Sequence, residues 1–108
     1  MLTQQAALDY GQQKVRCNAV CPGATRTRML GTMADRLAKK LGTDRAGAFA
    51  YFTRNVPLQR VSEPGEIAGL CCYLASDESS FMTGAALLVD GGAAIVDISG
   101  AAVTNAGL

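Results

Sequence analysis

The most constraining feature of this sequence is a short apolar run that ends abruptly at a proline and a glycine. Residues Val15 to Cys21 are mostly apolar, Pro22 and Gly23 stop the run, and threonines and arginines occupy positions 25 to 28. A nearly continuous apolar run is typical of a parallel strand that is covered on both faces. Ligands bind outside the carboxyl ends of such strands, so the pattern predicts a binding loop directly after the strand.

Helical and extended segments alternate along the rest of the chain. The predicted elements are helices over 1–11, about 28–55 (broken) and 64–76, and a second apolar strand over 85–89. Val56 to Ser62 is expected to be extended, because Pro57 prevents helix there. Strands that alternate with helices imply a parallel sheet, so the predicted fold class is α/β. Two strands alone make a marginally stable sheet, which predicts an incomplete fold.

Two short amphipathic helices are predicted directly after the loop. Met33, Leu37 and Leu41 recur every four residues and predict the buried face of the first helix, which Gly42 ends. Thr43 is expected to cap the second helix. A helix pair in this position either forms a lid over a ligand or only covers the edge of the sheet, and the sequence leaves both alternatives open.

Charge and composition exclude several classes of function. The 108 residues make at most one domain, and the net charge of +1 gives no field that would collect nucleic acid or an anionic membrane. No apolar run reaches about eighteen residues and no basic-then-apolar leader opens the chain, so neither a membrane span nor a signal peptide is indicated. The chain has no histidine, which excludes a Ser-His-Asp or Cys-His hydrolase built from this chain alone.

Four cysteines without a sign of secretion favour reduced thiols and a cytoplasmic location. Cys17 and Cys21 are expected on one side of a strand, whereas Cys71 and Cys72 diverge on a helix. Neither pair has the spacing of a zinc site, so no metal site is predicted and the thiols are interpreted as small buried hydrophobes. Asn18 is interpreted as a buried amide that satisfies backbone groups of a neighbouring loop.

Several short motifs occur in an order that resembles the C-terminal part of the short-chain dehydrogenase/reductase family. They are Val15–Gly23 followed by Thr27, Pro57–Arg60 before Glu63–Ala68, Leu74–Asp77, and Met82–Gly84 leading to Val89–Gly92. The resemblance implies the C-terminal part of a Rossmann-type doubly wound parallel sheet over residues 1–92. This part has the last two strands, the lid helices and the helix between them. Residues 93–108 are expected to form a C-terminal tail.

The resemblance also implies a cofactor and a set of residues that bind it. The expected cofactor-binding residues are Pro22, Gly23, Thr25 and Thr27. In the family a backbone group matching Thr25 contacts the nicotinamide carboxamide, and a threonine matching Thr27 reaches the diphosphate. The implied cofactor is NAD or NADP, and the implied substrate is a small secondary alcohol or ketone. Arg26 and Arg28 either add positive charge near the cofactor or are solvated loop arginines.

No catalytic residue is assigned to this chain. The family's phosphate loop, catalytic serine and Tyr-x-x-x-Lys pair would all precede Met1 by alignment, so we expect the chain to be inactive alone. Tyr10 and Lys14 have the spacing of the pair, but Gly11 lies between them and the strand follows at once. They are therefore not interpreted as catalytic.

Two further expectations follow from the resemblance. In the family the segments matching 64–76 and 85–90 pair across a two-fold axis, which implies a homo-oligomer, either a dimer or a tetramer. The alternative to an oxidoreductase part is a truncated interaction module that associates with intact subunits of the family. The aromatic residues Phe49, Tyr51 and Phe52 either line a substrate pocket or pack the lid, and the sequence does not decide between these roles.

Overall fold

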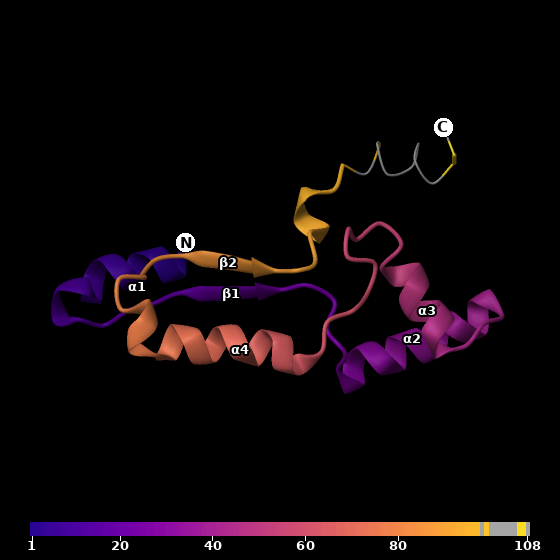
Figure 1. Cartoon of the computed structure of the whole chain (residues 1–108), viewed down its shortest axis with the longest axis horizontal. Coiled ribbons are helices and arrows are strands. Elements are labelled where there is room, and N and C mark those ends of the chain that lie inside the picture. The colour runs from indigo at the N-terminus through magenta and orange to yellow at the C-terminus, as the bar shows by residue number, and fades with distance from the viewer. Residues whose placement is uncertain (98, 100–105, 108) are drawn as a thin grey trace. The chain divides into compact units, whose positions relative to one another are not determined.

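A computed structural model describes residues 1–97, 99, 106 and 107 of the chain (Figure 1). The chain forms two compact units, Met1–Pro22 with Pro64–Val89, and Gly23–Glu63 with Asp90–Leu108. Each unit is described by itself below. The tail positions Ile98, Val103 and Leu108 lie outside the described residues. No helix in the described part of the chain is both long and apolar enough to span a membrane.

The first unit contains a parallel pair of strands. Strand β1 (Ala19–Pro22) pairs with β2 (Ala86–Val89), with Ala19 opposite Ala86. Helix α4 (Pro64–Ala75) runs along β1, and the two strands lie side by side in Figure 1. Pro64 is the first helical residue, where its fixed φ and missing N–H suit the helix start. The predicted parallel strands and the predicted start of this helix are confirmed.

The first strand is shorter than predicted, because side chains make most of the hydrogen bonds over residues 16–18. Among the described residues, only the Gly84 N–H donates to a backbone oxygen there, that of Cys17. The guanidinium of Arg16 donates to the carbonyl oxygens of Leu74, Ser76 and Met82, at 2.8, 3.3 and 3.2 Å. The Asn18 amide also donates to Met82 O at 3.0 Å, and its oxygen accepts from the Ala85 N–H at 3.1 Å. The predicted strand start at Val15 is wrong, whereas the predicted role of the Asn18 amide is confirmed.

Few side chains of the first unit are buried. Helix α1 (Leu2–Tyr10) buries Ala7, and α4 has no buried residue. Cys71 and Cys72 are exposed and Cys17 and Cys21 are only partly buried, so the interpretation of all four thiols as buried is wrong. The reason is that α4 packs along one side on β1, while its other sides have no cover among the described residues.

The second unit holds the compact core of the chain. Helices α2 (Arg28–Leu41) and α3 (Arg45–Phe52) pack together, as Figure 1 shows. The core residues are Ala34, Ala38, Ala48, Phe49 and Val61, with Leu30, Leu37 and Phe52 against them. The predicted buried face of α2 is therefore largely wrong, since Met33 and Leu41 are 50% and 44% exposed. Alanine side chains allow two helices to approach closely, and this contact orients α2.

The turns of the second unit depart from two further predictions. Gly42 ends α2 with φ +66°, as predicted, but Asp44 rather than Thr43 caps α3 and accepts from the Gly47 N–H at 2.8 Å. The segment predicted to be extended instead begins with a tight turn, in which Gln59 N–H donates to Val56 O at 2.8 Å. Gln59 has a φ of +50°, a value that residues other than glycine rarely adopt.

Replacing Lys14 with glycine is expected to stabilise the first unit. Lys14 has a φ of +60° after the 3-10 turn η1 (Gly11–Gln13), and glycine adopts this backbone without a Cβ penalty. We expect a gain of roughly 0.5–1 kcal/mol in the free energy of unfolding, measured by thermal denaturation. The matched Arg36→Gly variant, in the exposed middle of α2, should lose about 1 kcal/mol. Equal losses in both variants would contradict the assignment of strain to Lys14.

Candidate functional site

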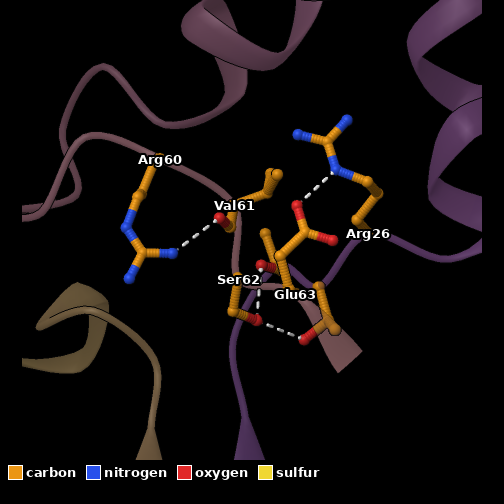
Figure 2. Close-up of polar contacts among 7 residues, drawn as sticks. Arg26, Arg60, Val61, Ser62 and Glu63 are labelled. Carbon is orange, nitrogen blue, oxygen red and sulfur yellow. Dashed lines mark hydrogen bonds and ion pairs between the residues drawn. The ribbon is translucent and has the colours of Figure 1, made fainter. Parts of the chain in front are cut away.

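The segment Gly23–Thr27 is tied to a second segment of the same unit. Thr25 forms an isolated parallel bridge with Ser62. Arg26 N–H donates to Ser62 O at 2.8 Å, and Ser62 N–H donates to Ala24 O at 2.9 Å. Figure 2 shows Ser62 beside this segment. The bridge therefore fixes the backbone on both sides of Thr25.

This bridge leaves the peptide groups of Thr25 itself available. In a parallel bridge, a residue whose two neighbours bond to the partner strand directs its own N–H and C=O to the opposite side. Neither group of Thr25 has a hydrogen-bond partner among the described residues. One donor and one acceptor thus lie on the same residue, which is the pair that a primary amide can bond.

The Thr25 side chain is occupied within the loop. Its hydroxyl donates to Gly23 O at 3.1 Å and accepts from the Ser62 hydroxyl at 2.9 Å. Thr25 is partly buried, so these bonds hold the loop in one conformation. Backbone groups, rather than this side chain, are therefore what Thr25 can offer to a ligand.

Gly23 lies against the backbone of Asp90. A Cβ at position 23 would stand 2.7 Å from the Asp90 Cα and 2.9 Å from its Cβ, closer than real Cβ atoms approach other atoms. Asp90 is itself fixed, because its carboxylate accepts from the N–H groups of Gly92 and Ala94, both at 2.9 Å. Only glycine fits at position 23 without a shift of the backbone.

Thr27 lies at the N-terminus of α2, where it caps the helix. Its hydroxyl oxygen accepts from the Leu30 N–H at 3.2 Å, and the side chain is exposed. The hydroxyl proton has no acceptor among the described residues, so it remains available to a ligand oxygen. The positive end of the helix dipole at this point favours an anionic ligand group.

Replacing Thr27 with alanine is expected to destabilise the second unit, because the Leu30 N–H loses its side-chain acceptor. We expect a loss of about 1 kcal/mol in the free energy of unfolding, measured by urea denaturation. Thr27→Ser keeps the hydroxyl and should retain most of the stability. An alanine variant as stable as the serine variant would contradict the role of Thr27 as the cap.

The Arg26 side chain contacts two other residues of the second unit and is therefore not a purely solvated loop arginine. Its Nε donates to Glu63 Oε1 at 2.8 Å, as Figure 2 shows, and its guanidinium lies 4.9 Å from the centre of the Phe49 ring. About half of each charged side chain in this pair is exposed, so the pair itself adds little stability. Arg28 is exposed at the first position of α2.

The remaining candidate residues belong to the first unit. Pro22 is the last residue of β1, where it pairs with Val89 in the first unit. Tyr10 ends α1, while Lys14 follows the 3-10 turn, so the two do not share one α-helix. Among the residues that the structure describes, no cluster of histidine, cysteine or acidic side chains has the geometry to hold a metal ion.

Sequence reasoning missed two residues that shape the site. The sequence predicts Ser62 only as part of an extended segment, and Asp90 only as part of the motif Val89–Gly92 that closes the second strand. The turn signal Asp90–Gly92 was visible, because Asp followed by glycines is typical of a tight turn. Nothing in the sequence pairs Ser62 with Thr25.

The chain matches a family model and a set of known proteins. The family model described as enoyl-(acyl carrier protein) reductase matches residues 1–94. The 2-keto-3-deoxy-L-fuconate dehydrogenase of Xanthomonas campestris is 46% identical over 91 residues, which are 84% of this chain and 29% of that enzyme. The chain thus spans about a third of the length of the relatives that it matches.

Two crystal structures extend the comparison to the fold. A short-chain dehydrogenase family protein from Francisella tularensis has a TM-score of 0.81 and 35% identity, over 87% of this chain and 39% of that protein. The L-sorbose reductase of Gluconobacter frateurii, in complex with NADPH and L-sorbose, has a TM-score of 0.80 and 28% identity, over 85% and 35%. The predicted α/β class, as part of a Rossmann-type fold, is confirmed. The chain belongs to the short-chain dehydrogenase/reductase family.

Proposed function

We propose that the chain supplies the nicotinamide side of an NAD(P)-dependent oxidoreductase, with Gly23, Thr25 and Thr27 as contacts and Pro22 leading into the loop. The observation that carries this proposal is the outward N–H and C=O of Thr25, which have no partner among the described residues. A nicotinamide carboxamide has one carbonyl acceptor and N–H donors, so it complements them. The Thr27 hydroxyl at the start of α2 suits a diphosphate oxygen.

The proposed reaction is hydride transfer between the nicotinamide and a small secondary alcohol or ketone. The cofactor, when bound, supplies the hydride or accepts it. The Xanthomonas relative is named for a keto sugar acid and the Gluconobacter enzyme for a keto sugar, which favours a hydroxylated ketone as the substrate class. Either NAD or NADP fits this proposal. We place the protein in the cytoplasm, because all four of its cysteines are free.

In the proposed reaction the residues of this chain bind and orient the cofactor, and none of them transfers a proton. The bridge to Ser62 holds the Thr25 peptide groups in place, and Gly23 allows the loop to lie against Asp90. No described residue is assigned as the general acid that such a reaction needs. We therefore expect the purified 108-residue chain to show no ketone-dependent oxidation of NADH or NADPH, and clear turnover would overturn this expectation.

A chimera tests the proposed function. The 91 residues of the Xanthomonas dehydrogenase that match would be replaced by those of this chain, and oxidation of its substrate assayed with NAD and NADP. We expect the chimera to bind one cofactor and to transfer hydride. A chimera that keeps its circular-dichroism spectrum and thermal transition, yet binds neither cofactor, would overturn the proposal.

A second candidate function, as an interaction module, rests on the exposed surface of the first unit. Helix α4 buries no residue, and Phe81 and Leu88 of the same unit are 104% and 60% exposed. Exposed apolar surface of this kind marks contacts between proteins. Segments 64–76 and 85–90 are accordingly proposed to pair in a dimer or tetramer. We propose neither a nucleic acid nor a membrane as a partner.

Co-expression distinguishes the second candidate function from the first. The chain and a full-length relative carrying a different affinity tag would be purified together and passed over a size-exclusion column. Co-elution at the mass of a mixed oligomer supports an interaction module. A well-folded chain that stays monomeric, both alone and beside the relative, would overturn both the module and the proposed homo-oligomer.

A further inference from the structure

A pocket in the second unit has no role in the proposed cofactor contacts. It has a volume of about 550 Å³ and lies between one side of α3, the segment 59–63 and Arg26. Its apolar lining includes Ala46, Phe49, Ala50 and Val61. Its charged lining consists of Arg26, Arg45, Arg60 and Glu63, of which Arg26 is paired with Glu63. The pocket therefore combines an apolar surface with several guanidinium groups.

Arg26 is held in place with its outer nitrogens unused. Its Nε donates to Glu63, and its guanidinium lies over the Phe49 ring. Figure 2 shows the two terminal nitrogens directed away from the Glu63 carboxylate. Within the described part of the chain these nitrogens have no hydrogen-bond partner. A guanidinium that is already oriented loses little entropy when it binds a carboxylate.

Arg45 offers a second oriented guanidinium. Its Nε and Nη2 donate to the two carboxylate oxygens of Asp35, at 2.8 and 2.5 Å. This hydrogen-bonded contact holds the pKa of Asp35 below its ordinary value, so the pair stays charged at neutral pH. Asp35 does not line the pocket, and the Nη1 of Arg45 has no partner among the described residues. The carboxylate thus orients Arg45, whose remaining nitrogen, Nη1, lies near Gly31 of α2.

The rim of the pocket contains a strained residue. Gln59 lines the pocket with a φ of +50°, and the adjacent Arg60 donates from Nη1 to Val61 O at 3.2 Å (Figure 2). Residues other than glycine in this conformation cost of order 1–3 kcal/mol and cluster at ligand sites. The rim of the pocket therefore includes a residue held in a strained conformation by the turn that begins at Val56.

We propose that this pocket binds a small organic carboxylate. The carboxylate accepts hydrogen bonds from the free nitrogens of Arg26 and Arg45, and the apolar part of the molecule lies on the exposed side chains of Ala46 and Ala50. Guanidinium groups bind carboxylates through paired N–H donors. An inorganic phosphate could use the same donors, but it has no apolar part to cover the rest of the lining. The proposal does not depend on the binding of NAD or NADP.

Titration of the full chain with benzoate, observed in its ¹H–¹⁵N NMR spectrum, tests the proposal. We expect saturable shifts at Arg26, Ala46 and Ala50, and at least roughly tenfold weaker binding of benzyl alcohol, which has the ring without the charge. Arg26→Gln and Arg45→Gln should each weaken benzoate binding by about three- to tenfold. Arg36→Gln removes one charge from α2 outside the pocket and should leave the affinity within about twofold.

Each other outcome of this titration overturns the proposal. Benzoate shifts that do not saturate, or that lie outside the pocket, exclude a specific site. An equal loss of affinity in Arg26→Gln, Arg45→Gln and Arg36→Gln indicates attraction by net charge alone. Tighter binding of inorganic phosphate than of benzoate contradicts the assignment to a carboxylate. A spectrum without dispersed amide signals also overturns it, because the pocket exists only in the folded unit.

Discussion

Gly23→Ala is expected to destabilise the second unit by about 2–3 kcal/mol and to remove cofactor binding in the chimera. The added Cβ would stand 2.7 Å from the Asp90 Cα, and a backbone atom cannot rotate away as a flexible side chain can. Asp90 is held by two hydrogen bonds from its own turn. The strain is therefore relieved by moving the loop, which carries the Thr25 peptide groups with it.

Gly69→Ala is the matched control for this substitution. Gly69 lies in the middle of α4, and a Cβ there meets no atom within 4 Å. This variant should gain up to about 1 kcal/mol, because alanine favours helix over glycine. Urea denaturation of the chain and cofactor titration of the chimera measure both effects. A Gly23→Ala chimera that keeps its stability and its affinity for the cofactor would contradict the close approach to Asp90.

Phe49→Ala is expected to cost about 3–4 kcal/mol in the free energy of unfolding of the second unit. Phe49 is the largest side chain of a small core, in which it packs beside alanines of α2 and α3 and beside Val61. Small side chains around it cannot close the cavity that the substitution leaves. A loss of this size is comparable with the whole stability of a small domain, so much of the unit should be unfolded.

Phe81→Ala is the matched control, because it makes the same chemical change at a fully exposed position. It should change the stability by less than about 0.5 kcal/mol. Thermal denaturation followed by circular dichroism at two wavelengths compares the variants. If Phe49→Ala and Phe81→Ala lower the stability equally, the core of the second unit is not where the structure places it.

The features that the sequence predicts well are those with a local cause. Pro64 begins α4 and Gly42 ends α2, because each residue fixes its own backbone. The buried side of α2 was predicted less well, because the alanines of α2 pack in the core while Met33 remains half exposed. The periodic pattern predicts that the large apolar side chains are buried. In the structure the small alanine side chains are buried instead, because they let the two helices approach closely.

In the candidate site, too, the features with a local cause could be predicted and those set by distant segments could not. The position of the loop after Pro22 could be predicted, because proline and glycine end a strand locally. The direction of the Thr25 peptide groups could not, because it is set by Ser62, 37 residues further along the chain. The crowding of Gly23 likewise depends on Asp90, on a distant turn of the same unit. Contacts between distant segments decide what the loop offers to a ligand.

The most direct test of whether the nicotinamide carboxamide binds at Thr25 compares the affinities of the chimera for NAD⁺ and for its 3-acetylpyridine analogue. The analogue replaces the carboxamide NH₂ with a methyl group, so it loses the N–H that would donate to the Thr25 C=O. The protein itself is unchanged. We predict about five- to tenfold weaker binding of the analogue, which corresponds to one lost hydrogen bond. Equal affinities for the two cofactors would contradict the placement of the nicotinamide at Thr25.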